Sequence, residues 1–477
     1  MFLGLDLGTS SLKAVLVEDG TVAAEAEAPL SVARPAPGWS EQDPGDWIAA
    51  AETALGALAA ARDLSGVAGI GLSGQMHGAT LLGADDAPLR PCLLWNDTRA
   101  AAEAAALDAD PRFRAITGNI VFPGFTAPKT DWVRAHEPET FAATRRVLLP
   151  KDYLRLWLTG EAASEMSDAS GTSWLDVGAR DWSDDLLAAT ELSRAAMPRL
   201  VEGAEVSGAL RGEAASRFGL TVGVPVAGGG GDNACAAVGA GVARPGEAFV
   251  SLGTSGVIFA ATDGFAPAPR TAVHAFCHAL PGAWHQMAVI LSAADSLTWL
   301  SGLTGRSAEA LTAGLGPARA PGRTLFLPYL GGERTPLNDA AIRGAFAGLE
   351  HATDAEAAAR AVLEGVCFAL RDGQDALAAT GTRPARLIAL GGGARSDAWL
   401  SILACALDLP VEAPAATAGG AALGAARLAM MACGAGPEVV APPRAERRFA
   451  PDPLLRAAFE AGHARHVAAR ETLGALR

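Results

Sequence analysis

Short apolar runs alternate along the chain with longer stretches in which alanine and leucine recur at helical spacing. Runs of the first kind are typical of strands and lie at residues 2–5, 13–17, 69–72, 226–227 and 248–252. Stretches of the second kind predict helices, for example over residues 47–61 and 355–379. The alternation of the two patterns predicts an α/β fold.

The sequence "LGTS" occurs twice, at residues 7–10 and at residues 252–255, and each copy lies between two apolar runs. Two hairpins of the same kind predict that the chain contains two related halves. Each turn alone also fits an ordinary hairpin in which glycine supplies a positive φ. As a pair, the turns fit a site in which their N–H and hydroxyl groups bind the phosphates of one nucleotide across a cleft.

The residue before the motif differs between the copies, because Asp6 precedes the first and Ser251 the second. A carboxylate inside an apolar strand is unfavourable unless it has a partner. Mg²⁺ binds one or two carboxylates together with waters and phosphates, so we expect Asp6 to be a metal ligand. The alternative is an aspartate that caps the turn through an Asx interaction.

A second carboxylate follows four consecutive glycines in "VPVAGGGGDNACAAVGA" at residues 224–240. Glycines allow the backbone to approach a ligand closely. Asp232 and Asn233 then begin an alanine-rich helix, whose dipole favours the ionised form of Asp232. The alternative for Asp232 is a simple N-cap.

Two further stretches carry polar groups at predicted turns. "GLSGQMHGATLLG" at residues 71–83 and "LLWNDTR" at residues 93–99 contain side chains suited to a polyhydroxylated ligand, namely Gln75, His77, Trp95, Asn96, Asp97 and Arg99. In "LIALGGGARSDAWLSILACAL", residues 387–407, three glycines follow a strand and precede a helix, which fits a bound nucleotide or a tight βα turn.

Composition excludes several classes of protein. The net charge of −14 is unsuited to a nucleic-acid partner, which requires clustered lysine and arginine. The chain has only three lysines, so phosphates would have to be bound mainly by backbone amides, hydroxyls, arginine or a metal.

Six cysteines without a C-x-x-C pair indicate neither a zinc site nor a disulfide framework. We find no basic leader and no run of 18 apolar residues, so we expect a cytoplasmic protein without membrane contact.

Several common nucleotide-binding and catalytic motifs are missing from the sequence. It contains no G-x-x-x-x-G-K-[ST], no H-R-D and no D-F-G, which excludes P-loop enzymes and protein kinases. Its glycine-rich stretches do not form G-x-G-x-x-G with an acidic residue about 20 positions later, which argues against hydride transfer.

Taken in order, seven motifs resemble the FGGY family of carbohydrate kinases: "DLGTSSLKAVL", "GLSGQMHG", "WNDTR", "GGGGDNA", "SLGTSG", "YLGGERTPLND" and "ALGGGARSDAW". The resemblance extends from residue 2 to about residue 427. It implies two actin-like, ribonuclease-H-like α/β domains with ATP in the cleft between them. We expect a sugar-binding and catalytic domain at residues 1–242 and a nucleotide-binding domain at residues 243–477.

The resemblance also implies roles for individual residues. Asp232 would be the general base, and the ketose would contact Met76, His77, Trp95, Asp232 and Asn233. Asp6 would be catalytic through Mg²⁺. Nucleotide binding would fall to both turns and the later glycines: Gly8, Thr9, Ser10, Ser11, Gly253, Thr254, Ser255, Gly392, Gly393 and Asp397, with Trp299 as a wall.

The implied reaction is ATP- and Mg²⁺-dependent phosphorylation of a ketopentose. "GLSGQMHG" is most similar to the branch that acts on D-xylulose; ribulose or a polyol is the alternative substrate. An actin-like ATPase regulator and a non-catalytic sugar-binding module are rival hypotheses, and a homodimer is an oligomeric state to test. Residues 416–426, "ATAGGAALGAA", depart from the family because no acidic residue precedes the glycines, and residues 122–129, "FPGFTAPK", resemble it without an assigned role.

Overall fold

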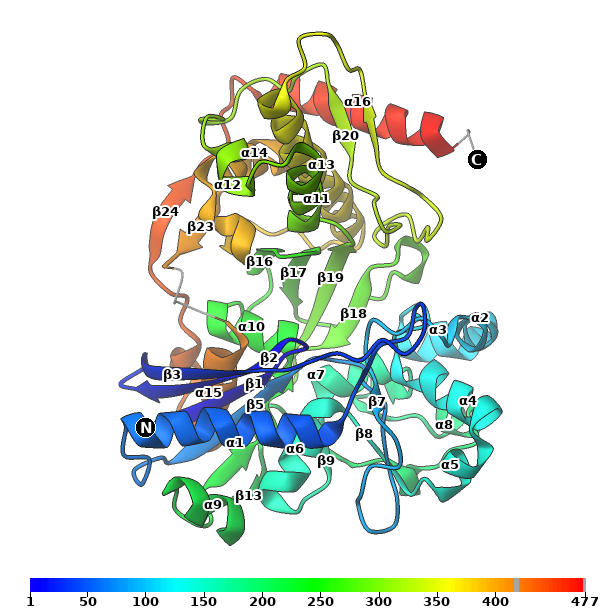
Figure 1. The fold of residues 1–477 in the computed structure, drawn as a ribbon, viewed down its shortest axis with the longest axis vertical. Coiled ribbons are helices and arrows are strands. Elements are labelled where there is room, and N and C mark those ends of the chain that lie inside the picture. The colour runs from blue at the N-terminus through cyan, green and yellow to red at the C-terminus, as the bar shows by residue number, and fades with distance from the viewer. Residues whose placement is uncertain (416–419, 475–477) are drawn as a thin grey trace.

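The computed structural model describes residues 1–415 and 420–474. Two mixed β-sheets form its centre, and each is covered by helices. Figure 1 shows the sheets one above the other, with the blue strands of the first half below and the green strands of the second half above. The alternation of strand and helix patterns in the sequence is therefore confirmed.

The first sheet has the strand order β13-β14-β5-β1-β2-β3, and β15 continues alongside β5. Its strands are β1 (Phe2–Leu7), β2 (Ser11–Glu18), β3 (Thr21–Pro29), β5 (Gly69–Gly74), β13 (Val206–Ala209), β14 (Pro225–Ala227) and β15 (Gly230–Gly231). β1 forms an antiparallel hairpin with β2 and pairs in parallel with β5. The leucines of β1, at positions 3, 5 and 7, are fully buried, as expected for a central strand.

Helices α1 (Pro44–Ala61) and α15 (Ala421–Ala432) pack against the first sheet. The approach of α15 depends on two glycines. A Cβ at Gly4 would lie 1.9 Å from the Ala422 carbonyl oxygen, and one at Gly71 would lie 1.8 Å from that of Ala425. A segment late in the chain thus returns to the sheet that the first residues build (Figure 1).

The second sheet has the order β18-β19-β17-β16-β22-β23-β24. Its strands are β16 (Ala248–Leu252), β17 (Gly256–Thr262), β18 (His274–Cys277), β19 (Trp284–Ile290), β22 (Leu387–Leu390), β23 (Val411–Pro414) and β24 (Ala445–Phe449). β16 pairs antiparallel with β17 and parallel with β22, which repeats the arrangement of β1 with β2 and β5. The two copies of "LGTS" therefore occupy equivalent positions.

Helices α13 (Ala355–Ala379) and α14 (Asp397–Leu407) pack together and contribute to the core of the second half. The remaining elements of this half are α11 (Ala294–Thr304), α12 (Ala308–Thr312), β20 (Leu325–Leu327), β21 (Ala345–Ala347), α16 (Arg456–Gly474) and the 3₁₀ turns η3 (Pro269–Thr271), η4 (Gly392–Arg395) and η5 (Pro437–Val440). On the face toward the first half, Phe249, Phe259 and Met287 pack with Ala237 of α10 (Asp232–Ala240). One apolar cluster therefore joins the two halves.

Most residues between β5 and β13 form an additional unit beside the first sheet, on the right in Figure 1. Its core includes Phe113, Trp174 and Leu186. Its helices are α2 (Ala101–Ala109), α3 (Pro111–Thr117), α4 (Thr126–His136), α5 (Pro138–Ala143), α7 (Met166–Ala169) and α8 (Asp184–Ala189). α6 (Pro150–Thr159) instead packs against β5 and α1, and α9 (Gly212–Phe218) comes after β13. Its short strands are β6 (Thr80–Leu82), β7 (Cys92–Leu93), which pairs with β4 (Glu41–Gln42), β8 (Arg146–Leu148), β9 (Ala163–Glu165), β10 (Leu175–Asp176), β11 (Asp181–Trp182) and β12 (Arg199–Val201).

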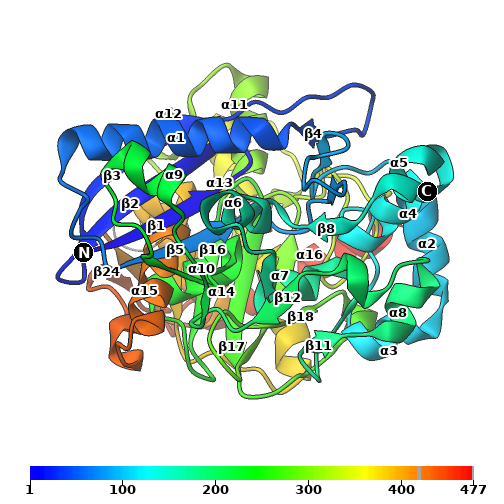
Figure 2. The same ribbon diagram turned by 90° about the horizontal axis from the view of Figure 1, so that it is seen from below.

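Figure 2 views the molecule from below, where α1 and β1, β2 and β3 lie toward one side and α2, α3, α4, α5 and α8 lie at the other. None of the helices in the described part of the chain is long and apolar enough to cross a membrane.

Candidate active site

Asp6 lies one residue before the end of β1 and is paired with Ser73 of the parallel strand β5. The Ser73 hydroxyl donates a hydrogen bond of 2.8 Å to Asp6 Oδ1. Burial raises the pKa of the Asp6 carboxyl, while the Ser73 bond and the charge of Lys13 act in the opposite direction. A half-buried carboxylate with a neutral donor beside it is suited to a bound cation.

Asp232 stands on the other side of the same strand. Gly230 of β15 is paired with Ser73, so Asp6, Ser73 and Gly230 form one row across three neighbouring strands. Asp232 begins α10 two residues later and accepts bonds of 2.6 Å and 2.9 Å from the backbone and side-chain amides of Asn233. Burial, and then the nearby charge of Asp6, raises the pKa of Asp232 to about 6. The structure therefore brings the two predicted carboxylates together.

The first "LGTS" turn is closed by a hydrogen bond of 2.9 Å from the Gly8 amide to the Ser11 carbonyl. Thr9 Oγ1 donates to Gln75 Oε1 at 3.0 Å and accepts from Trp95 Nε1 at 3.0 Å. The Ser10 hydroxyl group belongs to an exposed residue. The turn thus connects the Asp6 strand with Trp95, a residue that is 44% exposed.

β5 continues into the segment that contains Met76 and His77. His77 has a φ of 71°, and its ring stacks on Phe125 with 4.5 Å between the centroids. Nδ1 lies 2.7 Å from the Gly171 carbonyl oxygen and must donate to it, which leaves Nε2 as a hydrogen-bond acceptor. Burial lowers the pKa of His77 to about 3, so the ring is neutral.

Met76 connects this segment to Asp232. A Cβ added at Gly231 would lie 2.8 Å from Met76 Cγ, so the Met76 side chain packs directly on the residue before Asp232. The structure therefore places Met76, Asp232 and Asn233 in one region, with His77 adjacent in sequence to Met76.

The second half contains a cavity of about 1070 Å³ beside α11, α12 and α14. Gly392, Gly393 and Asp397 line it together with Leu297, Thr298 and other residues of the same half. This volume is large enough for a nucleotide-sized ligand. Three of the predicted nucleotide-binding residues thus line the same cavity.

The second "LGTS" turn lies beside this cavity. A Cβ at Gly391, which has a φ of 85°, would approach the Leu252 carbonyl oxygen to 2.9 Å, so the triple-glycine turn passes against the start of the motif. The carbonyls of Gly253 and Thr254 accept bonds of 2.8 Å from the amides of Ala294 and Ala293 at the start of α11. The turn is therefore fixed to a helix whose next turn lines the cavity.

Comparison with known proteins shows the family. Residues 1–239 match the N-terminal domain of the FGGY family of carbohydrate kinases, and residues 248–433 match the C-terminal domain. The chain belongs to the FGGY family of carbohydrate kinases. Its two-domain fold is accordingly the actin-like, ribonuclease-H-like architecture that the motifs predict.

Individual relatives of this FGGY kinase are close. It is 52% identical to the "Xylulose kinase" of Escherichia coli (strain K12) over 436 residues, which is 91% of this chain and 90% of that protein. The crystal structure of a "xyloylose kinase" from Brucella ovis matches with a TM-score of 0.98 and 57% identity over 100% of both chains. A xylulose kinase structure from Rhodospirillum rubrum matches with a TM-score of 0.92 and 32% identity, covering 100% of this chain and 99% of that one.

Trp299 and Asp397, two residues predicted to bind the nucleotide, make side-chain contacts that could not be predicted from the motifs. Trp299 stacks on Phe326 at 5.8 Å and, within the described residues, does not line the cavity, although Thr298 does. The Asp397 carboxylate is paired with Arg447, which also donates to the Ala394 carbonyl at 2.8 Å. Their roles toward a nucleotide stay predictions.

Asp97 and Arg99, two of the polar residues noted around Trp95, are structural in this kinase. Asp97 is fully buried and accepts from the Ser40 amide at 2.7 Å, and Arg99 binds Asp97 and lies over the Trp39 ring. These contacts hold the segment that carries Trp95. Residues 416–419, on which part of the expected departure from the family falls, lie outside the described residues.

Residues 122–129, to which the sequence assigns no role, support the His77 segment. Lys129 of α4 is fully buried and donates bonds of 2.8, 3.0 and 2.9 Å to the carbonyls of His77, Leu93 and Leu94. Thr126 donates a second bond to the His77 carbonyl at 2.9 Å. Burial lowers the pKa of Lys129 to about 7, whereas three acceptors match the three N–H groups of an ammonium. The one available signal was the rarity of lysine in this chain.

Arg334 was also missed, because it lies in the second half, far from His77 in sequence. Its guanidinium lies 4.5 Å from the Phe122 ring centroid, and its charge contributes to the low pKa of His77. The second half therefore places a cation beside the predicted sugar-binding segment.

Proposed function

We propose that this kinase transfers the γ-phosphoryl group of ATP to D-xylulose and forms D-xylulose 5-phosphate. The row that brings Asp6 and Asp232 to the two sides of β5 supports this reaction, because it sets a general base next to a cation-binding carboxylate. The substrate assignment is supported by the relatives named xylulose kinase, which match over nearly the whole chain.

Asp232 is the proposed general base. A sugar hydroxyl is too weak an acid to ionise at neutral pH, so its proton must be accepted as the new P–O bond forms. With a pKa of about 6, Asp232 is mostly ionised at pH 7 and still basic enough to take this proton. The Asn233 amides hold one carboxylate oxygen and thereby orient the group.

The ketose would bind between Asp232 and the Met76–His77 segment. The neutral His77 ring presents Nε2 as an acceptor for a sugar hydroxyl, and the exposed face of Trp95 offers an apolar surface for the sugar carbons. Lys129 and Thr126 hold the backbone of His77 in its positive-φ conformation.

The residues present fit Mg²⁺. Asp6 offers a hard oxygen ligand in a half-buried position, and its repulsion with Asp232 would be relieved by a divalent cation. Among residues 1–415 and 420–474, no group of three or more histidine, cysteine, aspartate or glutamate side chains could hold a metal, which fits an ion shared with phosphate oxygens. Mg²⁺ bound at Asp6 would neutralise charge on the transferring phosphoryl group.

ATP would bind in the second half, with its adenosine in the cavity lined by Gly392, Gly393 and Asp397. Amides and hydroxyls of the turns at residues 8–11 and 253–255 would bind the phosphates. In this proposal residues 1–242 bind the sugar and residues 243–477 the nucleotide, with α15 returning to the first sheet. A homodimer and a cytoplasmic location stay predictions.

The substrate is tested by measuring kcat/KM for D-xylulose, D-ribulose and several alditols at saturating Mg-ATP. We expect D-xylulose to give the highest value, and ³¹P NMR of the product to show a phosphate ester at carbon 5. A higher kcat/KM for ribulose or for an alditol would overturn the assignment of the substrate while leaving the reaction class intact.

A further inference from the structure

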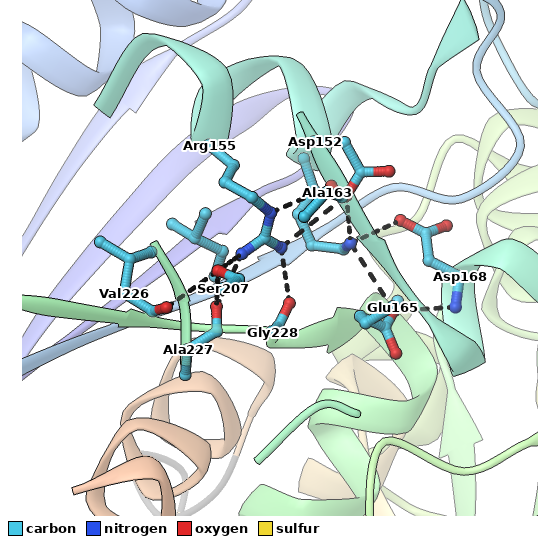
Figure 3. Close-up of polar contacts among 12 residues, drawn as sticks. Asp152, Arg155, Ala163, Glu165, Asp168, Ser207, Val226, Ala227 and Gly228 are labelled. Carbon is cyan, nitrogen blue, oxygen red and sulfur yellow. Dashed lines mark hydrogen bonds and ion pairs between the residues drawn. The ribbon is translucent and has the colours of Figure 1, made fainter. Parts of the chain in front are cut away.

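A cluster of five ionisable side chains is buried behind the glycine segment that leads to Asp232. It comprises Lys151, Asp152 and Arg155 of α6, Glu165 at the end of β9, and Asp168 of α7, shown in Figure 3. All five are fully buried. Lys151 is one of only three lysines in a chain whose basic residues are otherwise arginine, and it lies where a cation has no access to solvent.

The acidic and basic side chains of the cluster pair with one another, but they are not equal in number. Lys151 Nζ lies 2.8 Å from Asp152, 3.2 Å from Asp168 and 3.6 Å from Glu165, and Arg155 lies 3.8 Å from Asp152. Three carboxyl groups thus face two cations. Buried ion pairs are poor stabilisers, because apolar residues of similar volume often serve as well or better. Its role is therefore better explained by the backbone segment that its members contact.

Arg155 holds the start of the glycine segment. Its Nη1 donates to the Ala227 carbonyl at 2.7 Å and its Nη2 to the Gly228 carbonyl at 2.6 Å, as Figure 3 shows. Nε donates to the Ala163 carbonyl at 3.2 Å. Two parallel contacts of this kind require the planar fork of a guanidinium.

Glu165 and Ser167 hold the end of the same segment. The Ser167 hydroxyl donates to the Glu165 carboxylate at 2.8 Å and accepts the Gly231 amide at 3.0 Å. Glu165 is fixed in turn by the backbone amides of Ser167 and Asp168, at 2.7 Å and 2.8 Å. Gly231 directly precedes Asp232, so this chain of contacts ends next to the proposed base.

The glycine segment lies between these two sets of contacts. Residues 228–231 have no side chains, and Gly229 has a φ of 75° with the Leu72 carbonyl oxygen 1.9 Å from where a Cβ would lie. The close approach to β5 therefore requires glycine, while glycine makes the backbone flexible when it is unsupported. The amides of Gly228 and Gly229 donate to the carbonyls of Glu205 and Gly203 at 2.8 Å and 2.9 Å, and β15 pairs with β5. The contacts with Arg155 and Ser167 add side-chain constraint at the two ends of the segment.

We propose that Arg155, Glu165 and Ser167, held in place by Lys151, are positioning residues that set the location of the Asp232 carboxylate. This inference rests on the proposed function, because it assumes that Asp232 is the base. None of the four residues is placed in contact with substrate; each acts through the backbone of residues 227–231.

The test compares Ser167→Ala with Ser164→Ala. Both serines are buried in the same part of the chain, but the Ser164 hydroxyl has no hydrogen-bond partner among the described residues. We expect Ser167→Ala to lower kcat by about tenfold to a hundredfold, the range in which small misplacements of catalytic groups fall, with KM for ATP unchanged. Ser164→Ala should leave kcat unchanged.

A second readout does not depend on catalysis. Hydrogen–deuterium exchange of the 227–231 segment should be faster in Ser167→Ala than in Ser164→Ala, while the melting temperatures of the two variants stay close. Arg155→Lys keeps the charge and loses the fork, so it should reproduce the fall in kcat with unchanged KM for ATP.

The outcomes separate the two proposals. Wild-type turnover in Asp232→Asn would overturn the assignment of Asp232 as the base, and with it the positioning role, while leaving the proposed reaction intact. Loss of turnover in Asp232→Asn together with wild-type kcat and exchange in Ser167→Ala would overturn the positioning role alone. A fall in kcat of equal size in Ser164→Ala and Ser167→Ala would also overturn it.

Discussion

The two "LGTS" turns have the same backbone setting and different surroundings. Each joins an antiparallel hairpin whose first strand has a parallel neighbour, β5 in the first half and β22 in the second. In the first half, Asp6 is paired with Ser73; in the second, Ser251 is paired with Leu390. The repeat therefore keeps the same strand pairing in both halves, whereas the side chains at equivalent positions differ in chemistry.

The segments that leave the two parallel neighbours, β5 and β22, differ in the same sense. β5 continues into Gln75, whose side chain binds the first turn, and Met76, whose side chain packs on Gly231 next to Asp232; His77 follows. β22 continues into Gly391–Gly393, which leave a cavity open beside the second turn. One half thus has polar side chains where the other has glycine backbone and a cavity, which is the difference on which the proposed sugar and nucleotide sites depend.

The largest effect is expected from the first half. Asp232→Asn removes the proposed base while keeping the size of the side chain, so kcat should fall on the order of 10²–10⁴-fold with little change in KM for ATP. Steady-state rates at saturating D-xylulose and Mg-ATP measure this. A kcat within about threefold of the wild-type value would show that another group accepts the proton.

The equivalent positions Asp6 and Ser251 provide the sharpest contrast between the halves. Asp6→Asn should lower the rate on the order of a hundredfold and shift the Mg²⁺ dependence to higher concentration, because a carboxylate ligand is lost. Ser251→Ala should have a much smaller effect. Titration of the rate with Mg²⁺ checks both, and equal curves for the wild type and Asp6→Asn would reject the metal role.

His77→Ala tests the sugar side of the comparison. Loss of the Nε2 acceptor should raise KM for D-xylulose roughly thirtyfold, equivalent to about 2 kcal/mol for a hydrogen bond and its packing. KM for ATP should stay constant. An effect confined to KM for ATP would show that His77 affects binding of ATP and not of the sugar.

Gly392→Ala tests the nucleotide side. A Cβ at Gly392 meets no heavy atom of the described structure within 4 Å and would project into free space beside the cavity, so folding should be unaffected. KM for ATP should rise roughly tenfold, the lower end of the effect of one methyl group in a close-fitting pocket. Gly391→Ala is the contrasting variant, because its positive φ and the contact with Leu252 predict lower thermal stability. Unchanged KM for ATP in Gly392→Ala would argue that the nucleotide lies elsewhere.

The pH dependence should report the interaction between the two carboxylates. Protonated Asp232 cannot accept a proton, so kcat/KM for D-xylulose should fall as the pH decreases through about 6, the raised pKa of Asp232. In the metal-free protein, loss of the Asp6 charge in Asp6→Asn should lower the pKa of Asp232, which ¹³C NMR titration of its carboxyl group measures. An unchanged pKa would mean that Asp6 does not influence Asp232.

Much of the frame could be predicted from sequence. Periodicity located β1, β5, β16 and α13, and the repeated turn indicated two related halves, because these signals are local. Asp6 and Asp232 were recognisable because each is a carboxylate in an otherwise apolar or glycine-rich context. Their proximity across Ser73 required the strand order.

The supporting residues could not be predicted in the same way. Lys129 binds the carbonyl of His77 from 52 positions away, and Arg155 binds Gly228 from 73 positions away. Such contacts depend on how helices pack against loops and leave no periodic pattern. For the same reason, the return of α15 to the first sheet and the packing of Trp299 on Phe326 became visible only in the structure.

The most direct test of the account is an assay in which chromatography separates the isomeric phosphosugars formed from an equal mixture of D-xylulose and D-ribulose with Mg-ATP. We predict that D-xylulose 5-phosphate predominates, that ATP consumption without sugar is slow, and that Asp232→Asn forms almost no product. ATP hydrolysis at the same rate with and without sugar, and no phosphosugar, would contradict it.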